Sequence, residues 1–249
     1  MVLSCAGLAL GYPGHIVARD LSFALRPGEV MAVIGHNGSG KTTLVKTVLG
    51  VTAPAAGALR WTEPRPKEIG YLAQLSEFDR RFPIRVRELA AMGAWRGLGF
   101  WGGVDAAARQ RIAAALETTG VAEIAEKPLH HLSGGQLQRA LFARAIVQDA
   151  PLVLLDEPFA AVDQQTEAQL LTLIGRWAAE GRAVILVVHD LSSVLERCSH
   201  ALLLGRGGGL FGSVDTVVTA ERLVEYGYFS TSQAEWFQRA GGSRRRSDA

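Results

Sequence analysis

Residues 35–42 have the types and the spacing needed to hold a phosphate. They read Gly35-His36-Asn37-Gly38-Ser39-Gly40-Lys41-Thr42, which fits the pattern G-x-x-x-x-G-K-[ST]. Glycines let the backbone wrap closely around an anion, so that N–H groups and a helix N-terminus face it. In this pattern Lys41 reaches the β- and γ-phosphates of a nucleotide, and the Thr42 hydroxyl binds Mg²⁺. The alternative is a chance glycine-rich turn.

The elements on either side of this loop favour the phosphate site. Residues 30–34 form a short apolar run that predicts a buried strand. Residues 43–49 have helical apolar spacing and predict a helix. Strand, glycine-rich loop and helix are the context that the pattern requires.

Further polar residues follow three other predicted strands. Asp156 and Glu157 come after the apolar run 152–155; Asp156 has the chemistry to hold Mg²⁺ through water, and Glu157 to polarise an attacking water. An exposed turn is the structural alternative for this acidic pair. Gln74 follows a short strand at 69–73, and His189 follows an apolar strand at 183–188. Ligands of open parallel sheets bind at the carboxyl edge where such residues lie.

A second glycine-containing motif lies at Leu132-Ser133-Gly134-Gly135-Gln136. Ser133 and Gln136 fit a capping box that begins a helix. Two glycines in a first helical turn cost about 1 kcal/mol each relative to alanine. That choice is explained if an anion approaches the backbone closely at the helix N-terminus. A plain capped helix is the alternative.

The remaining pattern divides the chain into β-rich ends and a helical middle. Strands are expected at 8–10, 21–25, 58–61 and 201–204, and turns at Gly11, 13–14, 27–28 and 205–209. In the middle, we expect a helix at 86–92, a loop at 93–103 and a helix from Asp105 as N-cap to about residue 119. Two more helices are expected, at 164–180 and, capped by Thr219, at 219–226. Residues 241–249 are expected to be disordered, with Arg244–Arg246 as a solvated tail.

Composition narrows the class of protein. The 249 residues are 48% hydrophobic and 20% charged, as in ordinary globular proteins. The formal net charge is only +2, so charge alone gives no reason to expect a nucleic-acid partner, and none is predicted. Cys5 and Cys198 make neither a disulfide framework nor metal-ligand spacing, which favours a reducing, cytosolic location. No apolar run is long enough to span a membrane, so work at a membrane would require a partner.

Taken in order along nearly the whole chain, these motifs resemble the nucleotide-binding subunit of ATP-binding cassette (ABC) transporters. The resemblance implies an α/β fold: a P-loop NTPase (RecA-like) core, an N-terminal antiparallel β part and a helical subdomain that carries the LSGGQ signature. It implies one ABC ATPase domain at 1–240, with the core and β part at about 1–74 and 149–240 and the helical subdomain at about 75–148.

The resemblance also assigns roles to single residues. Tyr12 resembles the aromatic residue that stacks on adenine, where a buried or edge tyrosine would otherwise be favoured. Glu157 resembles the catalytic base, and His189 the switch histidine that steadies the γ-phosphate. Gln74 resembles the glutamine that reaches Mg²⁺ and the attacking water. The nucleotide-binding set is completed by the Walker A residues Gly35, His36, Asn37, Gly38, Ser39, Gly40, Lys41, Thr42 and Thr43, by Ser133, Gly134, Gly135 and Gln136, and by the D-loop aspartate Asp163; Thr42, Gln74 and the Walker B Asp156 form the Mg²⁺ set.

The family resemblance implies ATP and Mg²⁺ as cofactors and a second copy of the chain as partner. Two chains packed head to tail would enclose two ATP molecules, each between the P-loop of one chain and Ser133–Gln136 of the other. Long coiled-coil insertions or a second P-loop, which are common in ABC proteins of DNA repair and translation, do not occur. A binding module without turnover is disfavoured by Glu157 and His189. Exporters commonly fuse a membrane domain to the ATPase, and this chain shows none.

The segment after Gln74 resembles that of zinc and manganese importers. This likeness lies in residues 78–89 and 92–93, and it extends to residues 141–145, 148–150, 156–159 and 162–163. It implies that a membrane permease docks near Phe82–Met92. The implied function is an ATPase that powers uptake of a divalent metal, with zinc as the first candidate and manganese or iron next. The implied location is the cytoplasmic face of the inner membrane. A periplasmic or extracellular metal-binding protein is implied as an indirect partner. An importer of iron-chelate, haem or cobalamin cargo is the alternative. Cys198 and His200 alone are too few ligands for a zinc site.

Overall fold

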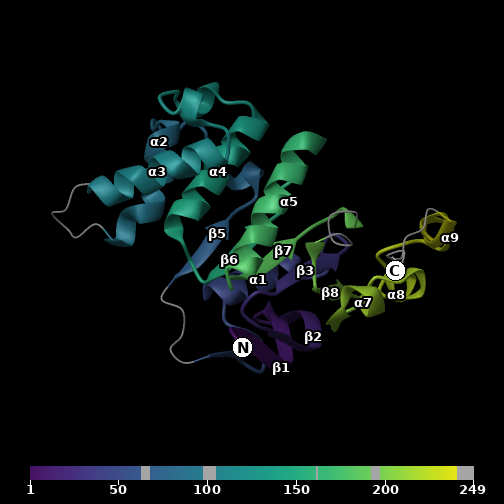
Figure 1. Ribbon diagram of the computed structural model, residues 1–249. Helices are drawn as coiled ribbons and strands as arrows, with labels where there is room; N and C mark the ends of the chain where they lie inside the picture. The colour runs from purple at the N-terminus through teal and green to yellow at the C-terminus, as the bar shows by residue number, and fades with distance from the viewer. Residues whose placement is uncertain (63–67, 98–104, 161, 192–196, 240–249) are drawn as a thin grey trace. The chain divides into compact units, whose positions relative to one another are not determined.

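The computed structural model describes residues 1–62, 68–97, 105–160, 162–191 and 197–239 (Figure 1). The chain divides into two compact units, Met1–Lys67 with Gly175–Ala249, and Glu68–Ile174. The predicted bounds of the helical subdomain, 75–148, stay a prediction. The expected disordered tail at 241–249, with Arg244–Arg246, lies outside the described residues. Residues 98–103 of the loop expected at 93–103 also lie outside them.

The first unit contains the predicted N-terminal antiparallel sheet. Its strands are β1 (Leu3–Tyr12), β2 (His15–Leu25) and β4 (Leu59–Trp61), in the order β2-β1-β4. Gly11, expected in a turn, instead pairs with Ile16 inside the β1–β2 hairpin. The strands extend this far because the turn is made by two residues, Pro13 and Gly14, the latter with φ +80°. A Cβ on Gly11 would lie 2.4 Å from the His15 carbonyl oxygen, so the hairpin requires glycine there.

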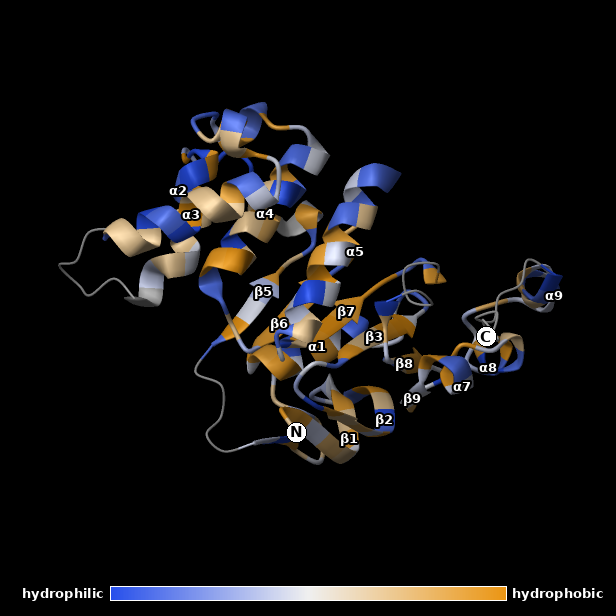
Figure 2. Cartoon of the chain, in the orientation of Figure 1, coloured by the Kyte–Doolittle hydropathy of each residue, from blue (hydrophilic) through white to orange (hydrophobic). Residues whose placement is uncertain are grey.

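The same unit contains the strands that lead to the phosphate loop. They are β3 (Val30–Gly35), β7 (Ala183–Val187), β8 (His200–Gly205) and β9 (Gly208–Ser213), in the order β7-β3-β8-β9. β3 pairs in parallel with both β7 and β8. Every residue of β3 and β7 is buried, as expected for parallel strands covered on both faces. Figure 2 shows these strands as mostly hydrophobic.

Strand β9 corrects the expectation of a loose turn at 205–209. Arg206 (φ +47°) and Gly207 (φ +76°) form a two-residue hairpin turn with positive φ at both positions, which matches the twist of the paired strands. β9 then pairs antiparallel with β8 from Gly208 onward. It also contacts β2: the rings of Phe23 and Phe211 lie 6.3 Å apart. Its many glycines concealed this strand in the sequence.

The second unit combines a pair of parallel strands with helices. β5 (Ile69–Leu72) pairs with β6 (Leu152–Asp156). The longer helices are α2 (Val86–Ala91), α3 (Ala106–Thr118) and α4 (Gly134–Gln148), which contact one another. Short 3₁₀ helices lie at Leu75–Glu77, Met92–Gly97, Ala122–Ile124 and Leu129–His131. Helix α5 (Gln164–Ala179) contains the boundary between the units.

Two local expectations in this unit have different outcomes. The Asp105 carboxylate accepts a hydrogen bond of 2.6 Å from the Ala108 N–H, so the predicted cap of α3 is confirmed. The loop expected from Gly93 is wrong for residues 93–97, which are in a 3₁₀ helix. A Cβ on Gly93 would lie 2.4 Å from the Arg144 carbonyl oxygen, so this glycine lets the 3₁₀ helix pack directly on the α4 backbone.

Among the described residues of the first unit, three helices follow β9. They are α7 (Val214–Val217), α8 (Ala220–Glu225) and α9 (Thr231–Arg239). The predicted cap of α8 is confirmed, because Thr219 Oγ1 accepts a hydrogen bond from the Arg222 N–H. Helices α7 and α9 were not expected from the sequence. Within the described part of the chain, no helix is both long enough and apolar enough to cross a bilayer.

Candidate active site

The phosphate loop joins β3 directly to helix α1 (Lys41–Leu49). Gly38 and Gly40 have φ angles of +82° and +106°, which side-chain-bearing residues rarely adopt. Gly40 is also the N-cap residue of α1. The glycines of the pattern therefore serve the purpose expected of them: they turn the chain so that it enters the helix with its first N–H groups facing the loop.

The Lys41 side chain lies over this loop. It is 8% exposed, and its Nζ donates hydrogen bonds to the carbonyl oxygens of Gly35 (2.6 Å) and His36 (3.2 Å). These bonds fix a positive charge at the N-terminus of α1, where the helix dipole is also positive. No acidic residue occurs in the first turn of the helix. The electrostatics of the loop therefore favour an anion.

The loop also contains a buried hydroxyl that fits a ligand. Ser39 is 5% exposed, and its Oγ has no hydrogen-bond partner among the described residues. Buried polar atoms normally have a partner, so an unsatisfied one inside an anion cradle is best explained by the ligand itself. Gly35 has no room for a side chain, since a Cβ there would lie 2.3 Å from Ser39 Oγ. The remaining predicted loop residues differ in exposure: Thr43 is buried, whereas His36, Asn37 and Thr42 are exposed.

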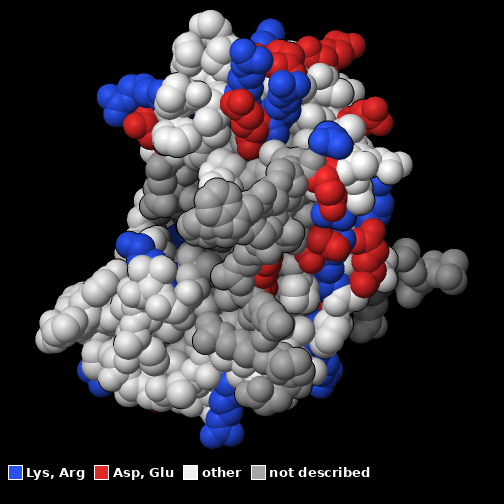
Figure 3. Space-filling view, turned by 90° about the vertical axis from the view of Figure 1, so that its left-hand side faces the viewer, with Lys and Arg blue, Asp and Glu red and all other residues white. Residues whose placement is uncertain are grey.

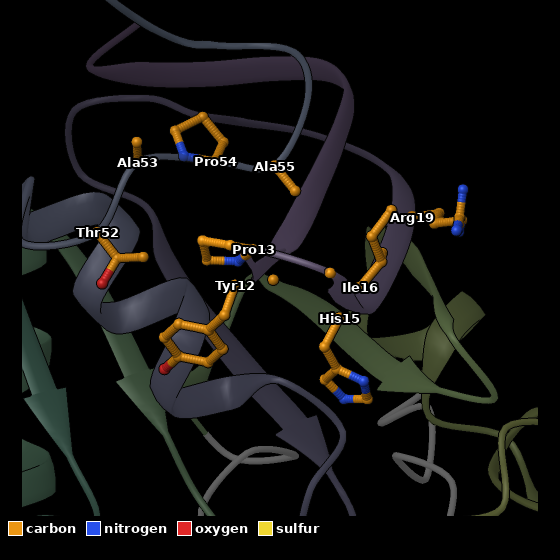
Figure 4. Close-up of a pocket in the computed structure, with 11 residues that line it drawn as sticks. Tyr12, Pro13, His15, Ile16, Arg19, Thr52, Ala53, Pro54 and Ala55 are labelled. Carbon is orange, nitrogen blue, oxygen red and sulfur yellow. The ribbon is translucent and has the colours of Figure 1, made fainter.

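Tyr12 borders a cavity of about 610 Å³ at the end of the β1–β2 hairpin (Figure 4). The opposite lining comes from residues 52–55, which follow helix α1. The Tyr12 side chain is 45% exposed, and Figure 4 shows its ring and that of His15 projecting to the same side. A cavity of this volume beside an accessible aromatic face is suited to a small planar group.

His189 lies two residues beyond the end of β7 and is exposed. The chain just before it is tied to β3, because the Val188 N–H donates to the Val33 carbonyl (3.2 Å). The His189 carbonyl accepts a hydrogen bond from the Tyr228 hydroxyl. Burial and the nearby Asp190 charge raise the pKa of Tyr228 to about 12, so this phenol keeps its proton at neutral pH.

In the second unit, Gln74 and Asp156 follow neighbouring parallel strands. Leu72 pairs with Leu155, so the ends of β5 and β6 coincide. Asp156, the last residue of β6, is 3% exposed, and Gln74 is half-buried. Glu157 has φ +50°, a conformation that costs free energy in a residue other than glycine and that is concentrated at functional sites. These backbone positions bring an amide and a carboxylate to one edge, as predicted.

The LSGGQ segment has the predicted capping box. Ser133 Oγ accepts from the Gln136 N–H (3.2 Å), and Gln136 Oε1 accepts from the Ser133 N–H (3.1 Å). Gly134, Gly135 and Gln136 are half-buried, and Ser133 is exposed. The first turn of α4 is thus an accessible helix N-terminus with two residues that lack side chains, which is a suitable place for an anion.

Three polar side chains of α4 were not recognised in the sequence. Gln138, 2% exposed, donates through Nε2 to the Pro158 carbonyl (2.7 Å), next to Glu157. Arg144 donates to the Tyr71 carbonyl (2.7 Å), and Gln148 to the Ile69 carbonyl (3.3 Å), both in β5. Burial lowers the pKa of Arg144. The available signal was polar residues on a helix whose other buried positions are apolar.

Asp163 occupies the position before helix α5 and caps it. Its carboxylate accepts hydrogen bonds from the Thr166 N–H (2.8 Å) and Oγ1 (3.0 Å). Chiefly the backbone hydrogen bond from Thr166, and then the hydroxyl, lower the pKa of Asp163 below its usual value. Capping α5 is a sufficient structural reason for an aspartate at this position. The contact of Asp163 with a nucleotide stays a prediction.

The predicted residues fall into two sets. The first unit contains Tyr12, residues 35–43 and His189, and in it the phosphate loop and His189 follow the adjacent parallel strands β3 and β7. The second unit contains Gln74, Ser133–Gln136, Asp156, Glu157 and Asp163. That the residues of the two sets form one site stays a prediction.

Comparisons with known proteins match this pattern. The family described as "ABC transporter" matches residues 18–160. The chain is 37% identical to the zinc import ATP-binding protein ZnuC of Pseudomonas aeruginosa, over 80% of this chain and 70% of that protein. It is 34% identical to the manganese transport system ATP-binding protein MntB of Bacillus subtilis, over 87% and 88%.

A solved structure with a similar fold also comes from an ABC transporter. An inward-facing conformation of a proposed metal-chelate type ABC transporter superimposes with a TM-score of 0.81 at 28% identity, over 91% of this chain and 89% of that chain. The predicted fold class, a P-loop NTPase core with an antiparallel β part and a helical part, is confirmed by this likeness.

The Asp163 cap generates a prediction about pH. A folded-state pKa below the usual 3.8 means that the carboxylate stabilises the fold above pH 3.8, and that this contribution is lost as the pH falls through the lower folded value. We expect Asp163→Asn to lower the melting temperature at pH 7 and the deficit to shrink below about pH 4. Thermal unfolding of both proteins over this pH range measures it. Thr166→Val, which keeps the backbone donor, should show a smaller pH-dependent deficit; a deficit of Asp163→Asn that is constant with pH would contradict the assignment.

Proposed function

The chain belongs to the ABC transporter family of ATPases, and from this premise we propose that it is the ATP-hydrolysing subunit of an importer for a transition-metal ion. The observation that supports a metal ion as the cargo is the likeness to zinc and manganese transport subunits over at least 80% of the chain. Zinc is the first candidate because the zinc import relative has the higher identity of the two, 37% against 34%. A metal chelate is the second candidate, supported by the structural relative of metal-chelate type.

We assign nucleotide binding in the first unit to the phosphate loop and the Tyr12 cavity. The Lys41 ammonium, the N–H groups at the start of α1 and the Ser39 hydroxyl would hold phosphates, and the Tyr12 ring would stack on adenine. Thr42, Gln74 and Asp156 offer the hard oxygen ligands that suit Mg²⁺. When bound, Mg²⁺ would neutralise the charge that develops on the phosphate oxygens.

We assign catalysis to three residues that follow strand ends. Glu157 would accept the proton of the attacking water, and Gln74 would orient that water with its amide. His189 would donate a hydrogen bond to the γ-phosphate. Membership of the family and the order of the motifs support the assignment of all three to one nucleotide.

We propose that the second nucleotide contact comes from another copy of the chain. Ser133, Gly134 and Gln136 of one copy would hold the γ-phosphate bound by the phosphate loop of the other. The accessible, glycine-containing first turn of α4 supports this role, since it offers backbone N–H groups at a positive helix end. ATP would then join the two copies, and hydrolysis would release them.

The permease is proposed to dock near Phe82–Met92. Phe82 and Met92 are 56% and 43% exposed, and Trp95 just beyond is 71% exposed. Large exposed apolar side chains in one short segment are typical of interaction sites. Beside them, α2 and α3 line a cavity of about 610 Å³ whose apolar lining includes Ile112 and Leu116.

The rim of this cavity carries charges that compensate one another. Glu126 forms ion pairs with Arg85 (2.8 Å) and Arg87 (2.7 Å). Figure 3 shows basic and acidic side chains mixed over the upper part of the face that it presents. An apolar groove with a balanced rim suits a short amphipathic helix from a permease. The subunit would thus act on the cytoplasmic face of the membrane, and a metal-binding protein on the other side would supply the cargo.

Glu157→Gln tests the ATPase assignment. The amide keeps the shape of the side chain but cannot accept the proton, so we expect kcat to fall by about 10²–10⁴-fold while ATP binding is retained. The stalled protein should form a dimer at saturating ATP, measured by light scattering after gel filtration. Glu123→Gln, at an exposed position, should hydrolyse ATP like the parent. A Glu157→Gln protein that stays monomeric with bound ATP would speak against the proposed dimer.

Phe82→Ala combined with Met92→Ala tests the docking segment. The isolated subunit should keep its ATPase activity, whereas ATP-driven transport by the complete transporter should be lost, because the proposed permease contact lies outside the nucleotide site. Transport assays in proteoliposomes and ATPase assays on the free subunit measure the two effects. Trp236→Ala removes a comparably exposed aromatic side chain (69%) and should leave transport intact. Normal coupling in the double variant would place the permease contact elsewhere.

Metal-dependent growth tests the cargo. Cells that lack this chain should grow poorly under metal chelation, and zinc should restore growth at lower concentration than manganese or iron. Growth should return with the wild-type chain and not with Glu157→Gln expressed at the same level, because uptake requires hydrolysis. Uptake of radioactive zinc by the same strains gives the direct measurement. Rescue by an iron chelate or haem alone would favour the second candidate.

A further inference from the structure

The segment that joins two C-terminal helices contacts His189, two residues beyond β7. The segment between α8 and α9 contains Tyr228, whose hydroxyl donates a hydrogen bond to the backbone carbonyl of His189. Both residues belong to the first unit, although 39 positions separate them in sequence. Neither the family motifs nor the capping pattern of α8 accounts for this contact.

The end of helix α8 fixes the position of Tyr228. Gly227 has φ +72°, and its N–H donates to the Val224 carbonyl (3.0 Å). The Tyr228 N–H donates to the Leu223 carbonyl (2.8 Å). Together these bonds form a Schellman motif, which terminates the helix in one defined geometry. Leu223 is fully buried, so the motif is anchored in the core of the unit.

The α8 end is in turn packed against strand β8. A Cβ on Gly205 would lie 1.9 Å from the Tyr226 carbonyl oxygen, which means that the two backbones touch. β8 pairs with β3, the strand that enters the phosphate loop. The centroid of the Phe229 ring lies 5.2 Å from that of the Tyr228 ring and 5.4 Å from that of the Phe237 ring. Phe237 is 8% exposed. Tyr228 is therefore held by the same framework that holds the phosphate loop.

We propose that Tyr228 is a positioning residue for His189, and that the C-terminal helices thereby set the orientation of the switch histidine relative to the phosphate loop. The proposal rests on the role proposed above for His189. The chain is hydrogen-bonded to β3 up to Val188, and the exposed His189 follows immediately, outside strand β7. A bond to the His189 carbonyl restrains that backbone without engaging the imidazole. Since the phenol stays protonated at neutral pH, the restraint is present under all ordinary assay conditions.

Tyr228→Phe is the direct test, because it removes one hydroxyl and keeps the ring. We expect kcat for ATP hydrolysis to fall by about threefold to tenfold, as for the loss of one hydrogen bond. The KM for ATP should change by less than about twofold, since binding is assigned mainly to the phosphate loop and Tyr12. Unchanged KM and nucleotide affinity would also establish that the variant is folded. Tyr226→Phe, two residues away, is the matched control and should behave like the parent; a Tyr228→Phe protein with the parent kcat would overturn the proposal.

A double-mutant cycle with His189→Ala separates positioning from a general structural effect. If Tyr228 acts through His189, then adding Tyr228→Phe to His189→Ala should cause no further loss of kcat. A further loss of the same size in both backgrounds would overturn the proposal. Full activity of His189→Ala itself would refute the proposed role of the histidine and this inference with it. Loss in His189→Ala beside an unaffected Tyr228→Phe would refute the inference alone.

Discussion

The fully buried parallel strands constrain where this chain can place its chemistry. Every residue of β3, β6 and β7 is buried. Uncompensated polar groups inside such strands would cost too much free energy, so residues that meet solvent and ligand gather at the strand ends. The phosphate loop follows β3, Asp156 is the last residue of β6, and Gln74 and His189 each lie two residues beyond β5 and β7. Position along a buried strand thus decides which residues are available for catalysis.

Helix α4 shows how polar side chains away from solvent are compensated by hydrogen bonds. The buried Gln138 and the half-buried Arg144 and Gln148 each donate to a backbone carbonyl of the second unit. Two of these carbonyls lie in β5, which leads to Gln74, and one lies at Pro158, next to Glu157. The helix that begins with the LSGGQ turn is therefore hydrogen-bonded to strand β5 and to the segment that follows β6.

The sequence predicted the elements whose signals are local. The glycine loop, the capping boxes and caps at Ser133, Asp105 and Thr219, and the continuous apolar strands all depend on neighbours within a few residues. The misplaced elements depend on contacts distant in sequence. Strand β9 is rich in glycine and is defined by its pairing with β8, and Gly93 is explained only by the α4 backbone that it touches. Tyr228 and Gln138 were missed for the same reason, since each has its partner far along the chain.

The two units share one way of fixing a proposed catalytic residue. In one, Gln138 donates to the carbonyl of Pro158; in the other, Tyr228 donates to the carbonyl of His189. Neither bond engages the Glu157 carboxylate or the His189 imidazole. A restraint on the backbone narrows the directions that a side chain can take. Such a restraint matters most for Glu157, whose positive φ must be maintained by surrounding contacts because the isolated residue disfavours it.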